Sequence, residues 1–481
     1  MFFGIVSHPP YVLGLLATLA ALCVPFALAI FCLPEELRKK PRVPVIPTFL
    51  SFLAGETEDV RTRRLILRTA QQHDSGLVIM WALGSWYVHV VDSELGKRLM
   101  EHKTVRKQPA RAEMLFWRLT GAQNVIFSDG DTWARHAESV RSVLHNHLPM
   151  DIFAALSRKL IRIIGDGGRI RWSDYTHRFT LDVVGLAIMG YDFDTLEDPN
   201  GTLVQQYTSV MTDISHPLYV GFPILEKIFP RRRLRERVDS LREVFRRLLE
   251  SKKHTPGTDY VSIMLNTGSM SDDEYLDNTV TMFMAGHDTT AGSLSSVFYY
   301  LAKYPDIQDR ARSEVLAAIA VDSDPTTASF RETPFLNACI REALRLNGPS
   351  VMTLPRVSDQ PLVLDSWVIP PGTPVILNLY GVLHNPRHWT SPDEYLPDRW
   401  LTREKSAGEV GAWMPFGSGP RRCPAMNFSL YEQRTLLALF LREFRWTLPA
   451  NSMHRTTLRN ALSTFALNLP EELDLEFKRI A

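Results

Sequence analysis

Apolar residues recur along most of the chain at the spacing of amphipathic helices, and only three segments show the pattern of strands. Residues 77–91 carry two apolar runs separated by Gly84 and Ser85, which predicts a β-hairpin. Residues 367–378 and 463–469 show shorter strand patterns. Because strands do not alternate with helices, the pattern excludes a parallel α/β sheet and predicts a mainly helical domain with small β-sheets.

One long helix is predicted in the middle of the chain. Ser271-Asp-Asp-Glu274 fits a capping box, in which the first and last residues satisfy each other's backbone N–H groups. No proline follows until Pro305, so a helix of about 34 residues and about 50 Å is expected. Val280 and Phe283 belong to its apolar stripe.

Small and polar residues interrupt this helix, in the run Ala285-Gly-His-Asp-Thr-Thr290. Ala285 and Gly286 leave room for a flat cofactor or for dioxygen. Thr289 can bond a backbone carbonyl or a water, and Asp288 can pass protons inward from solvent. Threonine in a helix is more often a plain packing or surface residue, so the segment alone leaves that interpretation open.

The N-terminal segment is predicted to be a membrane anchor. Residues 1–34 contain no Asp, Glu, Lys or Arg, and residues 11–33 are largely apolar, enough for a helix to cross about 30 Å of hydrocarbon. A cleaved signal peptide is the alternative, but it normally has a basic start and a shorter apolar region. The cations that follow place the rest of the chain on the cytosolic side; they are Arg38, Lys39, Lys40 and Arg42. Three prolines predict a stiff hinge over residues 35–47, and residues 48–481 then form one domain.

Composition supports a folded protein and gives no sign of nucleic-acid binding. The 481 residues are 45% hydrophobic and 22% charged, with a formal net charge of +1. The basic run at residues 231–237 lies in a stretch with apolar residues at helical spacing, so it predicts an amphipathic helix with a solvated cationic face. Four cysteines form no disulfide framework and suit a reducing compartment; they are Cys23, Cys32, Cys339 and Cys423.

The most specific local pattern is a loop around Cys423, just before a helix predicted over residues 425–443. Gly417 and Gly419 allow sharp turns that bring backbone N–H groups near the sulfur. Arg421 and Arg422, with the N-terminus of the following helix, favour a thiolate that can bind a metal. The loop reads Phe416-Gly-Ser-Gly-Pro-Arg-Arg-Cys-Pro-Ala425.

This loop closely resembles the haem-binding signature of cytochromes P450, in which a cysteine thiolate holds the iron. The resemblance implies that Cys423 is the metal ligand of a haem, although Ala425 stands where the family usually has glycine. The small polar run also resembles the oxygen-activation segment of this family. That resemblance implies that Thr289 hydrogen-bonds dioxygen at the haem and that Asp288 feeds protons to it. His287 stands at the variable position and is expected to be a packed side chain.

Further residues match family elements in the same order along the chain. The family's Glu-x-x-Arg element is matched by Glu342 and Arg345, and the arginine of its Pro-Glu-Arg-like element is matched by Arg399. The resemblance implies that these three residues form a buried ionic triad with a structural role. Asp398 replaces the commoner glutamate beside Arg399. The haem propionates need cations or N–H donors, and the resemblance implies four candidates: Trp133, His136, Arg356 and Arg421. The cation usually found four residues after the tryptophan is Ala137 here.

The resemblance covers residues from about 41 to the C-terminus and implies the P450 fold and a membrane-anchored monooxygenase of the microsomal type. Such an enzyme oxidises a substrate with O₂ and electrons from NADPH-cytochrome P450 reductase, with cytochrome b5 as a second candidate partner. The expected location is the endoplasmic reticulum membrane, single-pass, with the catalytic domain cytosolic. Two alternatives stay open at this point: an isomerase or dehydratase of the same fold that does not use O₂, and a non-catalytic haem-binding membrane protein.

The substrate is expected to be an apolar small molecule, such as an intermediate of natural-product biosynthesis. Family substrate contacts correspond here to residues 111–127, 207–225 and 350–354, which are rich in apolar side chains. These include Phe116, Trp117, Phe222 and Val351. The apolar stretch 217–225 is a candidate for contact with the bilayer.

Overall fold

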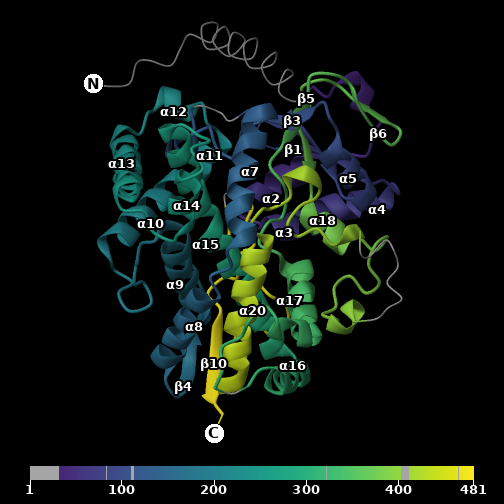
Figure 1. Cartoon of the computed structure of the whole chain (residues 1–481). Coiled ribbons are helices and arrows are strands. Elements are labelled where there is room, and N and C mark those ends of the chain that lie inside the picture. The colour runs from purple at the N-terminus through teal and green to yellow at the C-terminus, as the bar shows by residue number, and fades with distance from the viewer. Residues whose placement is uncertain are drawn as a thin grey trace, which may run out of the picture.

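The computed structural model of the chain describes residues 32–480 apart from 83, 110–112, 321, 402–410 and 464. Most of the predicted anchor therefore lies outside the described residues. Within the described part, no helix combines the length and apolar character needed to cross a membrane. Three helices from distant parts of the chain pack together in the middle of the molecule (Figure 1): α7 Gly130–Asn146, α15 Asp272–Lys303 and α20 Met426–Glu443.

Helices dominate the fold, as the periodicity predicts. Figure 1 shows them filling the left and lower parts of the molecule, with the larger sheet at the upper right. Their bounds are α2 Val45–Leu53, α3 Glu58–Arg61, η2 Thr62–Leu67, α4 Arg68–Gln72, α5 Ser93–Glu101, α6 Leu115–Thr120, α7 Gly130–Asn146, α8 Met150–Ile164, α9 Trp172–Val184, η3 Gly185–Met189, α10 Thr202–Ile214, α11 Pro217–Gly221, α12 Leu225–Ile228, α13 Arg232–His254, α14 Tyr260–Leu265, α15 Asp272–Lys303, α16 Pro305–Ala318, α17 Pro334–Asn347, α18 Leu379–His384 and α20 Met426–Glu443, with short helical turns η1 Glu35–Leu37, η4 Ser329–Glu332, η5 Pro397–Trp400 and η6 Gly419–Arg421.

The strands form three small sheets. The five-stranded sheet has the order β1-β2-β8-β5-β3, and the predicted hairpin is its edge pair, with Leu77 opposite Val90 and Ala82 opposite Ser85. A three-stranded sheet has the order β4-β10-β9, and β6 pairs with β7. The strands are β1 Leu77–Ala82, β2 Ser85–Val90, β3 Val105–Lys107, β4 Gly167–Arg171, β5 Arg356–Ser358, β6 Leu362–Leu364, β7 Trp367–Ile369, β8 Val375–Leu377, β9 Phe444–Thr447 and β10 Asp474–Arg479.

The long helix α15 begins with the predicted capping box. Ser271 N–H donates to Glu274 Oε2 at 2.8 Å, and Glu274 N–H donates to Ser271 Oγ at 3.4 Å. Nearly every side chain of α15 is buried before residue 284 and after residue 289, so this helix runs through the main core. The segment between those points is more open, which already distinguishes it from an ordinary core helix.

The amphipathic helix predicted around the basic run is α13. Leu234, Val238, Leu241 and Phe245 are buried in the helical core, while Arg232, Arg233 and Arg235 of the basic run are exposed. The expected separation of an apolar stripe from a solvated face is therefore confirmed.

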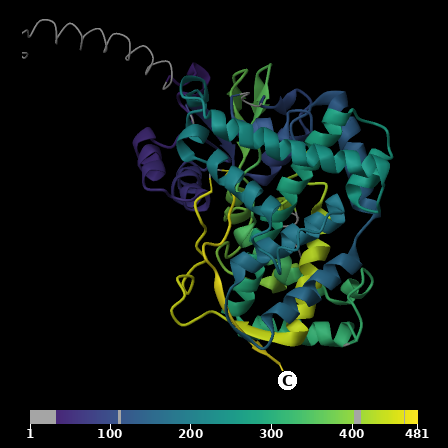
Figure 2. The ribbon, with the colours of Figure 1, turned by 90° about the vertical axis from the view of Figure 1, so that its left-hand side faces the viewer.

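Two local predictions need correction. Residues 35–47 do not form one extended hinge. Leu37 and Val43 are buried, and α2 already begins at Val45 because proline is tolerated in the first turn of a helix. The strand pattern near the C-terminus yields only isolated bridges, such as Leu467 with Ser350, because Ala466 adopts a positive φ of 55° that breaks the extended run. The last strand is β10, which lies at the lower end of the molecule (Figure 2).

Candidate haem-binding and oxygen-activation site

The cysteine loop is folded by its glycines, as predicted. Gly417 and Gly419 adopt φ values of 76° and 69°, in the region that glycine occupies without strain. The Cys423 N–H donates to Phe416 O at 2.9 Å, which closes the loop, and α20 starts three residues after the cysteine. The thiol is therefore held at a fixed point ahead of a helix N-terminus.

Desolvation raises the pKa of the Cys423 thiol, whereas the Ala425 N–H and the Arg422 charge lower it. The loop and its arginine thus act in the direction that the sequence predicts, while the net shift is upward. A bound cation reverses this balance, since a metal deprotonates its thiol ligand outright.

The oxygen-activation segment lies on α15, which is linked to α20 close to Cys423. Thr290 Oγ1 lies 3.1 Å from Ser429 Oγ, and Ser429 stands in the first turn of α20. Thr289 Oγ1 donates to Ala285 O at 2.8 Å, so the oxygen of its hydroxyl can still accept a hydrogen bond. Ala285 is exposed although the helix on either side of this segment is buried, so there is accessible space beside it. The structure thus brings Cys423 and this segment into one region.

Asp288 has two histidine partners. His177 Nδ1, from α9, and His287 Nε2 each lie 3.3 Å from Asp288 Oδ1. Burial acts to raise the pKa of Asp288, but the charge of His287 and the hydrogen bond and charge of His177 hold it at about 2. His287 is buried, and its Nδ1 lies 2.9 Å from Phe283 O, which agrees with the prediction that it is a packed side chain.

A second group of residues forms a cationic cluster beside the cysteine loop. Arg421 pairs with Asp129. Lys107, on β3, lies opposite Arg356 on β5, and its backbone N–H donates to Asp129 Oδ2 at 3.1 Å. Burial, together with the charges of Arg356 and Arg421, lowers the pKa of Lys107 to about 7. Sequence reasoning named Arg356 and Arg421 but missed Lys107 and Asp129.

This cationic cluster fits the two propionates of a haem. Arg356, Arg421 and a protonated Lys107 exceed the single carboxylate of Asp129 by two charges, and two propionates would balance them. Arg356 is only 3% exposed, yet its Nε and Nη2 have no hydrogen-bond partner among the described residues, and the same holds for Arg421 Nη1. Buried guanidinium N–H groups need acceptors, and carboxylates are the acceptors that match them.

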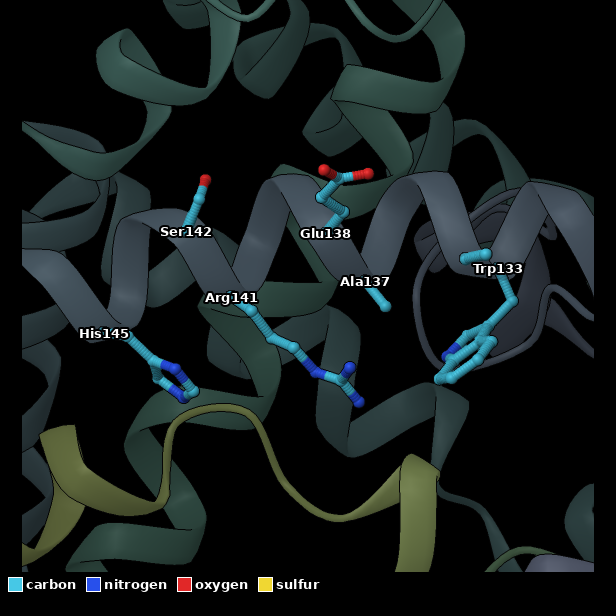
Figure 3. Close-up of a pocket in the computed structure, with 7 residues that line it drawn as sticks. Trp133, Ala137, Glu138, Arg141, Ser142 and His145 are labelled. Carbon is cyan, nitrogen blue, oxygen red and sulfur yellow. The ribbon is translucent and has the colours of Figure 1, made fainter.

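Trp133, on α7, belongs to this group, and Arg141, two turns further along the same helix, lies near its ring. The Arg421 guanidinium lies 4.2 Å from the centre of the Trp133 ring, and that of Arg141 lies 5.5 Å from it. Arg141 also donates to Pro420 O in the cysteine loop. Figure 3 shows Trp133, Ala137 and Arg141 pointing to the side of α7 where this loop runs, and Glu138 pointing the other way.

His136 is not brought to this cluster. It is fully buried, and its Nε2 lies 3.2 Å from Glu274 Oε1, near the start of α15. Arg135 pairs with the same carboxylate at 2.7 Å. His136 therefore connects α7 to the start of α15, through Glu274, and takes no part in the cationic cluster.

The predicted ionic triad is present and buried. Arg345 pairs with Glu342 at 2.8 Å and Arg399 pairs with it at 3.0 Å, with both members of the first pair fully buried. Trp400 Nε1 donates to Glu342 Oε2 at 3.0 Å, so both carboxylate oxygens are used. Arg345 additionally donates to the carbonyls of residues 383, 392 and 394, which secures the segment that precedes the cysteine loop.

Comparison with known proteins agrees with this geometry. A family model described as "Cytochrome P450" matches residues 41–475. The chain is 26% identical over 470 residues to the cytochrome P450 monooxygenase xanG of Aspergillus fumigatus, a match that covers 87% of this chain and 86% of that protein. It is 26% identical over 359 residues to cytochrome P450 4F5 of Rattus norvegicus, covering 67% and 68%. The crystal structure of the cytochrome P450DA heme domain has the same fold, with a TM-score of 0.75 at 22% identity over 92% of this chain and 96% of that one.

Proposed function

The chain belongs to the cytochrome P450 family and is a haem-thiolate monooxygenase, and we propose that it oxidises an apolar small molecule at the site described above. The observation that carries this proposal is an aromatic cluster on the substrate-facing segments. Phe116 lies 4.7 Å from Trp117 and 4.6 Å from Phe465, and Trp117 lies 4.3 Å from Phe127, measured between ring centres. Such a cluster favours an apolar ligand, because it offers dispersion contacts and few polar groups.

The same cluster lies beside the oxygen-activation helix. α6, which carries Phe116 and Trp117, packs against α15. Pro349 and Leu469 both contact α15 at Gly292, three residues after Thr289. Val351 N–H in turn donates to Ala466 O at 3.3 Å, so the predicted substrate segment 350–354 and the C-terminal segment form one wall. Phe465, which sequence reasoning missed, belongs to that wall.

The chain's own residues have distinct roles in this proposal. Haem, when bound, supplies the redox centre at which O₂ is reduced and the substrate oxidised. Cys423 Sγ would bind its iron, and the cationic cluster would hold its propionates. Thr289 Oγ1 donates to Ala285 O and so presents its lone pairs to the reacting side, while Asp288 holds or passes a proton next to it.

Product formation from a substrate tests this function. A library of apolar natural-product intermediates is first screened for compounds that shift the haem absorbance spectrum, because such a shift identifies a ligand. The purified protein, supplied with NADPH-cytochrome P450 reductase, should convert such a ligand only when NADPH and O₂ are both present. Conversion without O₂ would instead indicate an isomerase or dehydratase.

We also propose that the chain is anchored in the endoplasmic reticulum membrane with its domain cytosolic. The uncharged N-terminal segment followed by cations supports this. Exposed apolar side chains on α2 and around α11 and α12 offer further bilayer contacts; they are Ile46, Phe49, Leu50, Leu53, Leu218, Phe222, Ile224, Ile228 and Phe229. Retention in the microsomal pellet after alkaline carbonate washing is expected, and release by the wash would contradict the anchor.

Haem retention should depend on pH through Lys107. Its pKa of about 7 in the haem-free protein means that the lysine loses its charge as the pH rises above 7. Propionates stabilise the protonated form and raise that pKa, so haem binding takes up a proton in this range. The affinity for haem should therefore be highest and constant below pH 7, where Lys107 is protonated, and fall by up to about tenfold per pH unit above it.

Lys107→Arg should remove most of that pH dependence, because arginine stays charged throughout. Titration of the apoprotein with hemin at several pH values between about 7 and 9 measures both proteins. Parallel pH profiles for the wild type and the variant would show that Lys107 does not contact the bound group.

We propose that the electron donor, NADPH-cytochrome P450 reductase, docks on the face that carries the cysteine loop. Arg422 is exposed there, whereas Arg421 is engaged with Asp129. A groove of about 620 Å³ lies at this face and is lined by Arg141, Arg422 and Cys423, among others. Cations at this face would attract an acidic partner.

Arg422→Glu is expected to lower reductase-supported turnover severalfold, because it places like charges across the interface. Turnover driven by cumene hydroperoxide should not change, since it needs no reductase. Arg233→Glu, an exposed arginine on α13, is the matched control and should leave both rates unchanged. Equal losses in the two assays for Arg422→Glu would place its effect on the haem site and not on docking.

A further inference from the structure

The carboxylate of Asp288 is held by imidazoles from two different helices. His177 reaches it from α9, which packs along α15, and His287 reaches it from the preceding position on α15. Both nitrogens lie 3.3 Å from the same oxygen, Oδ1. The two histidines differ in access: the side chain of His177 is 39% exposed and that of His287 is 5% exposed.

The hydrogen-bond partners of His287 fix its role. Its Nδ1 lies 2.9 Å from the carbonyl of Phe283, which can only accept, so Nδ1 carries a proton. Nε2 can then donate to Asp288 only when the ring is cationic. The ring also packs against Phe283 and Tyr207, at 5.2 and 5.4 Å between ring centres. His287 is thus enclosed, and any proton that it passes to Asp288 cannot be replaced directly from solvent.

Tyr207, on α10, is a further titratable group that faces this cluster. Burial and the Asp288 charge raise its pKa well above the usual value, so its hydroxyl keeps its proton at neutral pH. Asp288, with a pKa of about 2, is ionised there. Asp288 must therefore take up a proton each time it delivers one. Its own side chain is 32% exposed, and of its two imidazole neighbours only His177 has substantial contact with solvent.

We propose that His177 is the proton donor that recharges Asp288 from solvent during turnover, an inference that rests on the monooxygenase activity. In one passage the proton on His177 Nδ1 moves to Asp288 Oδ1, and a solvent proton adds at Nε2 of the same ring. The imidazole is then left as the Nε2–H tautomer and returns to the Nδ1–H tautomer by proton exchange with water before the next passage, while Asp288 carries one proton toward Thr289. Net transfer is one proton inward, and no bond other than N–H and O–H bonds is broken or formed. His287 positions the carboxylate.

Two substitutions distinguish a proton relay through His177 from a purely positioning role and from a purely electrostatic role. His177→Gln keeps a side chain that can hydrogen-bond to Asp288 but cannot pass a proton. His177→Lys keeps a positive charge but remains protonated near neutral pH. A purely positioning role predicts a normal glutamine variant, and a purely electrostatic role predicts a normal lysine variant. The relay predicts that both are slow.

The assay uses the full-length holoenzyme with its reductase and follows NADPH-driven O₂ consumption in H₂O and D₂O. Both variants should lose about tenfold or more of the rate and show a larger solvent isotope effect than the wild type. Oxidation of guaiacol driven by cumene hydroperoxide should stay near the wild-type rate.

His73→Gln, an exposed histidine just after α4, is the control and should behave as the wild type in every assay. An unchanged CO-bound spectrum and melting temperature show that a His177 variant is folded. If either folded variant keeps the wild-type rate and isotope effect, the relay is refuted. A wild-type protein without any O₂-dependent NADPH oxidation would refute the proposed function instead.

Discussion

Glu342→Ala is expected to destabilise the protein by about 3–5 kcal/mol, because it leaves two buried guanidinium groups without their carboxylate. Arg345 and Glu342 are fully buried, and Arg399 and Trp400 bond the same carboxylate. Arg345 also holds three backbone carbonyls of the segment that leads toward the cysteine loop. The loss should therefore appear as a lower urea midpoint and as a lower haem content.

Asp398→Ala is the matched control for that substitution. Asp398 stands next to Arg399 in the sequence, but it forms an exposed pair with Arg310, at 2.8 Å. Exposed pairs contribute about 0–1 kcal/mol, so this variant should unfold almost as the wild type does. Similar urea midpoints for Glu342→Ala and Asp398→Ala would mean that the triad has no special structural role.

Cys423→Ser is expected to abolish reductase-supported oxidation while the protein stays folded. A serine hydroxyl is a harder and far less acidic ligand than a thiol, so it cannot replace the thiolate on iron. The loop itself is closed by backbone hydrogen bonds and by its glycines, which the substitution does not touch. Turnover of any identified substrate should fall to background, with the far-UV circular dichroism retained.

Cys339→Ala provides the comparison for the cysteine substitution. Cys339 is buried in α17, and burial raises the pKa of its thiol strongly, so it is an inert core residue. Its replacement should cost some stability and leave oxidation intact. Residual O₂-dependent oxidation in purified Cys423→Ser would show that another residue ligates the metal.

Local features of the fold could be predicted from the sequence because they depend on neighbours along the chain. The capping box at Ser271, the β-hairpin at residues 77–91 and the turns at Gly417 and Gly419 all follow from side chains a few positions apart. The Glu342 triad could be anticipated only through the family resemblance, since an i,i+3 pair is usually a solvated bridge.

Contacts between distant segments could not be predicted in this way. Lys107 and Arg356 face each other on neighbouring strands, and His177 and Asp288 lie on two neighbouring helices. Each pair is far apart in the sequence, so no short sequence pattern indicates the contact. The packing of residues 35–47 was missed because prolines suggest an extended chain but are equally compatible with the first turn of a helix. The place of His136 depends on which side of α7 faces α15, and periodicity alone does not give it.

The central claim is that Cys423 binds the iron of a haem through its sulfur. The most direct measurement is the absorbance spectrum of the reduced, CO-bound protein, recorded for the wild type and for Cys423→Ser. The wild type should show the long-wavelength Soret band that a thiolate ligand produces, and the serine variant should lack it entirely. A wild type that binds no haem, or a serine variant that keeps this band, would contradict the claim.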